Sequence, residues 1–310
     1  MINIVVKTQI ITTFWVALIH VTSVSGNKLY FIDAHSQVDH NVVPLHKVIS
    51  LMENEGVRQT ILSTRGNLKG APLLRLSRED PGRITPALRS KGKPYDTGSA
   101  KYYELLEKQI ATKQYQAIAE VLLYHAQKGN KAPEVIVYPD DKRVEVALNY
   151  AIKYDWPFVV HIEFASLNGK KRKKFMRSFK QMLDQHPEHP FILTHMGQLT
   201  SKRCLRLIEN HKNVYFHTGW SNPAAVESSN QPWTNVFDGD SLAPEWKDLF
   251  VQYPHRFIFA LDNVFSEHWS DFYRKQMNYW KSGLAELPAD IAHLIAHGNA
   301  ERLWHISSRD

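Results

Sequence analysis

From residue 29 onward, short apolar runs alternate with longer amphipathic segments, and this alternation constrains the fold more than any other feature of the sequence. Apolar residues that recur every three or four positions predict helices, and short runs that are apolar at consecutive positions predict strands buried on both faces. The predicted strands are 29–35, 57–64, 83–89, 117–125, 157–164, 190–195, 213–219 and 256–262. Helices are predicted between them, near 44–54 and over 101–112, 144–155, 171–185, 201–210 and 244–252.

Strands that alternate with helices in this way indicate an α/β fold, and a (β/α)8 TIM barrel fits the series better than an open sheet. A doubly wound open sheet would be expected to carry a glycine-rich turn, and neither G-x-G-x-x-G nor G-x-x-x-x-G-K-[ST] occurs in the sequence. The 310 residues could form two domains, but a barrel of this kind absorbs roughly 250 residues or more as one unit. We therefore expect residues 27–310 to form a single barrel domain.

The first residues have a different composition from the rest of the chain. Residues 8–27 contain no charged side chain, and Lys7 supplies positive charge ahead of the apolar stretch TQIITTFWVALIHV. This pattern is typical of a signal peptide, so we expect cleavage after residues 1–26 and export to the periplasm or the medium. An uncleaved membrane anchor is the alternative. The apolar part is shorter than the roughly 20 residues of a membrane span, and no stable span is expected.

Charge and cysteine content exclude several classes of function. The formal charge is +7, but the 38 basic residues are scattered apart from one run, Lys170–Lys174, which indicates a generally basic surface rather than a nucleic-acid footprint. The single cysteine, Cys204, excludes an internal disulfide and a cysteine-rich zinc module. We expect a small-molecule substrate, which could be anionic, no nucleic-acid partner, and homo-oligomers as an open option.

Polar side chains recur where the predicted strands end, directly after apolar runs. Each of them alone could be a polar cap or a turn residue, but a charge there is costly unless it is paired or bound to a metal. The carboxyl ends of all strands meet at one face of a barrel. We therefore expect one cluster over the barrel mouth, made of His35, Gln37, Glu120, His161, His195 and Asp262. Imidazole and carboxylate are ligands that zinc prefers.

The chain resembles the amidohydrolase superfamily in five segments: DAHSQ (33–37), VVHIEF (159–164), LTHMGQ (193–198), FALDN (259–263) and IAHGNAERLW (295–304). Specifically, it resembles the amidohydrolase-related (type 2) branch of metal-dependent TIM-barrel hydrolases and decarboxylases, and the similarity covers about residues 28–306. The G-N-A-x-R-L motif in the last segment is the most specific to this branch. By itself that motif would indicate only a helix start with Asn299 as the N-cap.

The resemblance implies that His35, His161 and Asp262 bind a metal, and that His195 is a second-metal ligand or a proton-transfer residue. It also implies that Asp262 is a general base, and it places Glu120 where some members have a bridging carboxylate or carboxylated lysine. Gln37 departs from the family pattern, which usually has His-x-His at the end of the first strand. An amide oxygen is a weaker ligand than imidazole, so one zinc ion, two ions, a harder ion such as manganese, or no metal all stay open.

We expect hydrolysis of a small ester, lactone or amide by metal-activated water, with Asp262 taking the proton and His195 stabilising the oxyanion. The alternatives are a metal-dependent nonoxidative decarboxylase of an unsaturated or aromatic acid and a binding protein on a catalytically decayed barrel. Arg65 and Arg89 are candidate clamps for a substrate carboxylate, or they are solvated loop charges. Trp220, in a long loop that follows the seventh strand, could line an apolar pocket or pack that loop on the barrel.

Overall fold

The structure is a computed structural model in which residues 29–42, 45–129 and 132–307 are described. The predicted signal peptide, residues 1–26, lies outside these ranges, so its cleavage stays a prediction. The assignment of 27–310 to a single domain also stays a prediction. Among the described residues, no helix is both long enough and apolar enough to cross a membrane.

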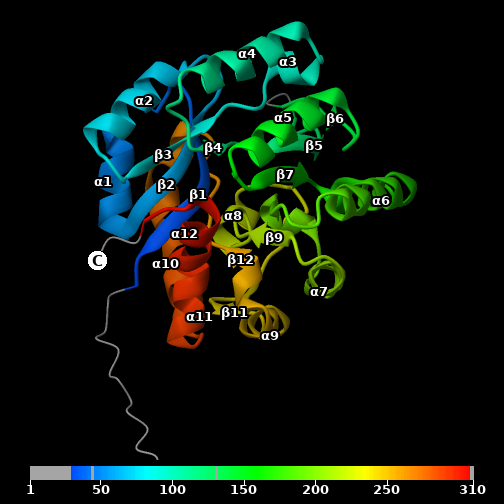
Figure 1. Ribbon diagram of the computed structural model, residues 1–310. Helices are drawn as coiled ribbons and strands as arrows, with labels where there is room; N and C mark the ends of the chain where they lie inside the picture. The colour runs from blue at the N-terminus through cyan, green and yellow to red at the C-terminus, as the bar shows by residue number, and fades with distance from the viewer. Residues whose placement is uncertain (1–28, 43–44, 130–131, 308–310) are drawn as a thin grey trace, which may run out of the picture.

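The strands curl into a parallel barrel (Figure 1). Its members are β1 (Phe31–Val38), β2 (Val57–Thr64), β3 (Ile84–Leu88), β4 (Ala117–Ile118), β5 (Val121–His125), β7 (Phe158–Ile162), β8 (Phe191–Leu193), β9 (Val214–His217) and β12 (Phe257–Ile258). They pair in the orders β1-β2-β3-β4 and β12-β9-β8-β7-β5. Backbone hydrogen bonds from Ala34 N to Phe259 O (3.0 Å) and from Asp262 N to His35 O (2.8 Å) join the first and last segments. The predicted (β/α)8 barrel is confirmed.

The helices of the described chain lie mostly around the outside of the barrel (Figure 1). They are α1 (His46–Glu55), α2 (Gly70–Glu79), α3 (Lys93–Asp96), α4 (Ala100–Ala111), α5 (Lys142–Lys153), α6 (Gly169–Gln185), α7 (Ser201–Asn210), α8 (Pro223–Glu227), α9 (Pro244–Gln252), α10 (Asp271–Ala285), α11 (Ala289–His293) and α12 (Asn299–Trp304). Three short strands were not predicted. β6 (Val135–Ile136) pairs antiparallel with β5, and β10 (Phe237–Asp238) pairs with β11 (Ser241–Leu242) in the long loop after β9.

The helices form where apolar residues recur on one side. In α7, Cys204, Leu207 and Ile208 are buried against the barrel, at the spacing that places them on one face of a helix. The start of α6 is capped by Asn168, whose side-chain oxygen accepts a hydrogen bond from Lys171 N (3.0 Å). Local sequence therefore accounts for both the position and the orientation of these helices.

The barrel interior is filled by side chains. Its lower layer is a buried apolar cluster to which most strands contribute, and which includes Ile32, Ile61, Ala87, Ala117, Val159, Ile192 and Ile258. Leu303 and Trp304 of α12 belong to the same cluster and close it at the amino-terminal end of the strands. Full burial of such side chains stabilises the fold by about 1.5–3 kcal/mol each. The polar side chains of the predicted cluster lie at the other end.

The fourth predicted strand, 117–125, is interrupted. β4 pairs with β3 and β5 pairs with β7, and the two residues between them belong to neither strand, although Ala119 N still donates to Leu88 O of β3 (3.0 Å). Ser90 Oγ donates to the carbonyl oxygens of Ala119 (3.0 Å) and Glu120 (2.6 Å), which occupies groups that a continuous sheet would use. The interruption leaves the Glu120 side chain at the mouth of the barrel.

The C-terminal part also differs from the prediction. The predicted strand 256–262 is regular only in β12. Beyond it, the Thr218 hydroxyl accepts from Ala260 N and donates to Ala260 O (2.9 Å each), so these backbone groups bond to a side chain instead of a neighbouring strand. The predicted N-cap role of Asn299 is wrong, since Gly298 precedes α12 in helical geometry. The Asn299 side chain instead donates to the carbonyl oxygens of Pro254 (2.8 Å) and Phe257 (2.7 Å). It ties α12 to the start of the last strand.

Candidate active site

The six residues predicted to form the metal cluster lie together at the carboxyl ends of the strands. Each of them is buried, with an exposed fraction of at most 4%. They come from different strands and from the turns that follow them: His35 and Gln37 in β1, Glu120 between β4 and β5, His161 in β7, His195 in the turn after β8, and Asp262 after β12. Positions two apart on a strand share a face, which is why His35 and Gln37 point to the same side. The parallel barrel brings the others to them.

Gln37 connects the two carboxylates at the centre of this site. Its Nε2 donates to Glu120 Oε1 and to Asp262 Oδ1, both at 3.2 Å. His35 Nε2 lies 3.3 Å from Asp262 Oδ1 and 3.7 Å from Glu120 Oε1. Burial alone would lower the pKa of His35, but these two carboxylates outweigh it and raise the pKa. The remaining amide atom, Gln37 Oε1, is buried and has no hydrogen-bond partner among the described residues.

His161 lies between two carboxylates. Its Nδ1 is 2.8 Å from Glu120 Oε2, and its Nε2 is 2.9 Å from Glu163 Oε1. Burial opposes the charged ring, but Glu120 and Glu163 outweigh burial and raise the pKa of His161. Both ring nitrogens therefore carry hydrogen in this arrangement. A metal at His161 would have to replace one of these two contacts.

His195 lies in a turn with left-handed backbone geometry (φ 53°). Its Nδ1 is 3.0 Å from the carbonyl oxygen of Gly219, which can only accept, so Nδ1 carries the hydrogen and Nε2 presents a lone pair. Burial, with the nearby charge of His161, lowers the pKa of His195 well below its usual range. A side chain at Gly219 would collide with His217 and Asp262, with contacts of 2.9–3.0 Å, so only glycine allows this approach.

The neutral His195 ring faces Asp262 across 3.4 Å, from Nε2 to Oδ2. Burial, with the nearby charge of Glu120, raises the pKa of Asp262. A lone pair and a carboxylate oxygen at this distance are two acceptors, which need a proton or a cation between them. This pattern favours His195 as a ligand or proton acceptor over the oxyanion donor that the sequence suggested.

Two lysines and one glutamate belong to the site but were missed from the sequence. Lys91, after β3, forms an ion pair with Glu120 Oε1. Lys128, after β5, donates to Glu163 Oε1 (2.5 Å) and lies 3.0 Å from His125 Nε2. Burial alone would raise the pKa of Glu120, but Lys91 and His161 hold it well below its usual range. Glu163 could have been found from the sequence, because it lies two residues after His161 within the predicted strand 157–164, at the spacing of residues on one face.

His217 and Asp33 support the cluster from below. The His217 ring lies 5.6 Å from the His35 ring and 5.4 Å from the His195 ring, and burial lowers its pKa well below the usual range. Asp33 accepts hydrogen bonds from Ser36 Oγ (2.5 Å) and Leu261 N (2.9 Å), which joins the first strand to the last. Burial raises the pKa of Asp33 to about 7.

The predicted substrate residues lie in the surrounding loops. Arg65 pairs with Asp39 Oδ2 at 3.4 Å and stacks on the Phe265 ring at 4.5 Å. Arg89 donates to the backbone carbonyls of Gly66 (2.6 Å) and Lys91 (3.0 Å), and in the described part of the chain no carboxylate lies within ion-pair distance of it. Burial, with the nearby charge of Arg65, lowers the pKa of Arg89.

Trp220 serves the loop and the site together. Its indole N–H donates to the carbonyl oxygen of Asp262 (3.0 Å), and its ring packs against Trp233 (5.6 Å) and His268 (5.1 Å). Trp233 in turn lies 4.9 Å from the His195 ring and 4.6 Å from Lys128 Nζ. The long loop after β9 thus covers the cluster with two indoles.

The donor set fits a divalent cation. Three groups of side chains bring ligand atoms within 4.8 Å of one another: His35, Glu120 and Asp262; Glu120, His161 and His195; and His125, His161 and Glu163. Imidazole and carboxylate suit zinc and similar ions. Two features would be satisfied by a cation: the facing acceptors of His195 and Asp262, and Gln37 Oε1, which has no partner within the described ranges.

Solved structures show the same fold at low sequence identity. An uncharacterised TIM-barrel protein from Bordetella bronchiseptica matches with a TM-score of 0.57 and 14% identity, covering 91% of this chain and 100% of that one. A putative 2-pyrone-4,6-dicarboxylic acid hydrolase from Pseudomonas putida matches with a TM-score of 0.55 and 12% identity, covering 91% and 100%. A zinc-bound amidohydrolase from Burkholderia multivorans matches with a TM-score of 0.51 and 13% identity, covering 90% and 100%.

A search of curated protein sequences gives no match. The amidohydrolase family model matches residues 131–306, which is more than half of the chain. This match includes β7, β8, β9 and β12 and therefore the segments that carry His161, His195 and Asp262. The chain belongs to the amidohydrolase family.

Proposed function

We propose that this protein is a metal-dependent hydrolase that cleaves a small ester, lactone or amide carrying a carboxylate group. One observation carries the proposal: five ligand or acid–base side chains from separate strands meet, buried, at the carboxyl face of the barrel. They are His35, Glu120, His161, His195 and Asp262. Burying so many titratable groups is costly unless they act together on a cation or a proton.

A divalent cation, for which we favour zinc, would be held by His35, Glu120 and Asp262, with His161 and His195 available for the same or a second ion. Such a cation acts as a Lewis acid on a carbonyl oxygen and makes a water molecule more acidic. Gln37 could act as a further oxygen ligand if its amide rotates by half a turn. Its Oε1 would then lie beside Glu120 and Asp262, where the cation is expected. Lys91 would exchange its contact with Glu120 for one with the substrate.

Asp262 is the proposed general base. Burial and Glu120 raise its pKa, which makes its carboxylate a better proton acceptor than an ordinary aspartate. Its backbone is fixed on both sides, since Asp262 N donates to His35 O (2.8 Å) and Trp220 Nε1 donates to Asp262 O (3.0 Å). The carboxylate is therefore positioned to take a proton from water and to return it to the leaving group. His195 Nε2, 3.4 Å away, can accept the same proton.

The carboxylate of the substrate would bind to Arg89 and Arg65. In the described part of the chain, the Arg89 side chain donates hydrogen bonds only to backbone carbonyls. Burial and the nearby guanidinium of Arg65 lower the pKa of Arg89. A guanidinium without an acidic partner is well suited to a bidentate carboxylate. Lys91 accepts a hydrogen bond from Arg89 Nε with its backbone carbonyl and pairs with Glu120 through its ammonium group, so it adds a third positive charge nearby.

The test combines metal content with activity. Purified protein should contain a stoichiometric divalent metal by elemental analysis, and zinc or manganese should raise its melting temperature after chelation. A panel of lactones and esters should release acid, whereas release of CO2 from aromatic acids would indicate a decarboxylase. Protein that neither binds metal nor turns over any compound would be a binding protein, and the proposal would fail.

The variant Asp262→Asn should abolish turnover and leave the fold intact, since the amide keeps the volume but cannot accept the proton. Asp240→Asn is the matched control, because Asp240 is an exposed residue in the hairpin loop between β10 and β11. Full activity in Asp262→Asn would exclude this residue as the base.

A further inference from the structure

A cavity of about 770 Å³ lies at the opposite end of the barrel from the candidate active site. Gln59 near the start of β2, Ile84 at the start of β3 and Gln116 just before β4 line it, as do residues 304–307 at the end of the chain's last helix. Gln59 and Ser63 lie four residues apart on β2, and Ser63 pairs with Gln37 of the active site. The two regions are therefore separated by roughly 13 Å along the strand.

Aromatic rings form part of the cavity wall. Tyr154 and Trp156 both line it and stack on each other, with ring centroids 4.9 Å apart and an angle of 21° between the planes. Tyr154 is 39% exposed, and Lys153 Nζ lies over its ring, 5.5 Å from the ring centre. Trp304 also lines the cavity, and its buried indole nitrogen has no hydrogen-bond partner among the described residues.

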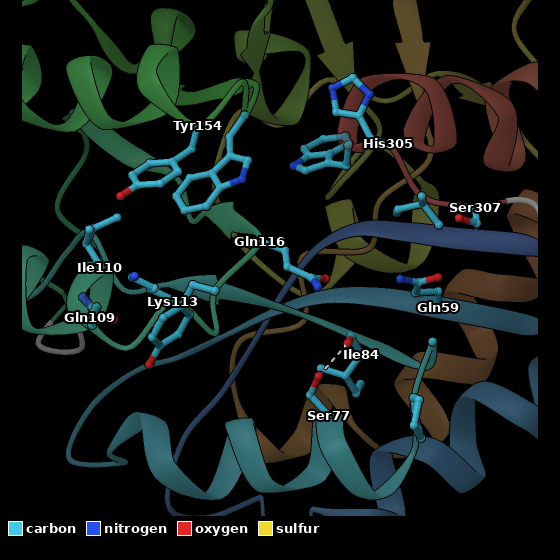
Figure 2. Close-up of a pocket in the computed structure, with 16 residues that line it drawn as sticks. Gln59, Ser77, Ile84, Gln109, Ile110, Lys113, Gln116, Tyr154, His305 and Ser307 are labelled. Carbon is cyan, nitrogen blue, oxygen red and sulfur yellow. Dashed lines mark hydrogen bonds between the residues drawn. The ribbon is translucent and has the colours of Figure 1, made fainter.

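Neutral polar groups complete the wall. Figure 2 shows Tyr154 and His305 on one side of the cavity, Ser77 and Ile84 on the other, and Gln116 between them. The Gln116 side chain is exposed and makes no hydrogen bond within the described residues. No aspartate or glutamate is among the described lining residues, and the basic ones are Lys113 and His305, the latter 2.9 Å from Asp155 Oδ2. The wall therefore combines aromatic faces with amides and hydroxyls and has little net charge.

We propose that this cavity binds a neutral saccharide of two or three pyranose rings, at a site separate from the catalytic one. The electron-rich face of an aromatic ring attracts the C–H groups on a pyranose face, and the Trp156 indole, which lines the cavity and stacks on Tyr154, offers such a ring. Amide groups donate to and accept from neighbouring hydroxyls, which suits Gln59 and Gln116. The volume lies in the range of about 300–1,000 Å³ that is typical of small-molecule sites. This inference does not depend on the proposed hydrolase reaction.

The test is isothermal titration calorimetry of the full chain with maltotriose, cellotriose and N,N′,N″-triacetylchitotriose. We expect at least one of them to bind. Trp156→Ala should weaken that binding at least about tenfold, whereas Trp156→Phe should keep most of it because the ring remains. Gln116→Ala should weaken it about threefold or more, and Gln114→Ala should not. Gln114 is an exposed glutamine in the same segment that lies outside the cavity wall and pairs with Arg78.

Two results would overturn the proposal. One is that none of the three saccharides binds. The other is that a saccharide binds equally well to the wild type, to Trp156→Ala and to Gln116→Ala, which would place it elsewhere, the active site included. Thermal melting of each variant shows whether it is folded, and the Trp156→Phe and Gln116→Ala variants keep the test valid if Trp156→Ala does not fold.

Discussion

The substitution Glu163→Gln tests the electrostatic account of the site without any assumption about substrate. Glu163 is 1% exposed, and its two oxygens contact His161 Nε2 (2.9 Å), Lys128 Nζ (2.5 Å) and Ala126 N (3.0 Å). Glutamine keeps the volume and one carbonyl oxygen, but it removes the charge that faces two cations. We expect a clear loss of stability in metal-free protein.

The magnitude follows from the structure in two ways. At 2.9 Å and an effective dielectric constant of about 20, the His161–Glu163 pair attracts by about 6 kcal/mol before the cost of desolvation. Burial alone would raise the pKa of Glu163, but His161 and Lys128 outweigh it and lower the pKa to about 2. A pKa moved from 4.5 to about 2 corresponds to about 3 kcal/mol at neutral pH. We therefore expect a loss of about 3 kcal/mol, similar to other broken buried pairs.

The assay is urea denaturation in the presence of a chelator, with Glu188→Gln as the control. Glu188 pairs with Lys212 at the same 2.5 Å, but its side chain is 81% exposed, so its replacement should change stability very little. The stability supplied by Glu163 is present above the unfolded pKa of 4.5 and is lost as the pH falls toward 2. The wild type and Glu163→Gln should therefore converge in acid. If Glu163→Gln lowers the free energy of unfolding no more than Glu188→Gln does, the contacts of Glu163 with His161 and Lys128 do not stabilise the fold as described.

Two further predictions concern other parts of the chain. Burial and His186 lower the pKa of His189 to about 4, so the folded state loses stability as the pH falls below 6.5. The substitution His189→Phe should reduce this loss of stability by about 1 kcal/mol at about pH 5, a figure that allows for the partial exposure of His189. Urea denaturation at several pH values measures the effect, and an unchanged pH dependence in the variant would contradict the prediction. The leader should be removed when the full chain is expressed in a secreting host. N-terminal sequencing should then begin near residue 27, and retention of residues 1–26 would favour a membrane anchor.

The order of strands and helices could be predicted because burial periodicity is a local property. β2 occupies the predicted range 57–64, and α7 the predicted range 201–210. The regular part of a strand was harder to predict where a side chain replaces a sheet contact. Ser90 interrupts the fourth strand and Thr218 ends the ladder of the last one, and both act on residues more than 25 positions away. Such distant contacts leave no periodic signal in the sequence.

The site could also be predicted only in part: residues at the strand ends were found, and the lysines in the loops were not. His35 and His161 could be found because a strand end is visible in the sequence and because all strand ends meet at one face of a barrel. Lys91 and Lys128 could not be found, since lysines in loops are ordinarily solvated and nothing local shows where a flexible side chain will point. Arg65 was predicted as a clamp, but the structure also pairs it with Asp39.

The sequence by itself determined the barrel, the family and the residue types of the site, because each depends on spacing along the chain. Only the tertiary structure decided the protonation pattern and the pairing. The carbonyl oxygen of Gly219 accepts the hydrogen on Nδ1 of His195. The carboxylates of Glu120 and Glu163 stabilise the protonated ring of His161. The Gln37 amide donates to the two carboxylates instead of offering its oxygen. The reason is that hydrogen bonds and pKa values depend on neighbours within a few ångströms in space, and the fold brings those neighbours from distant positions in the chain.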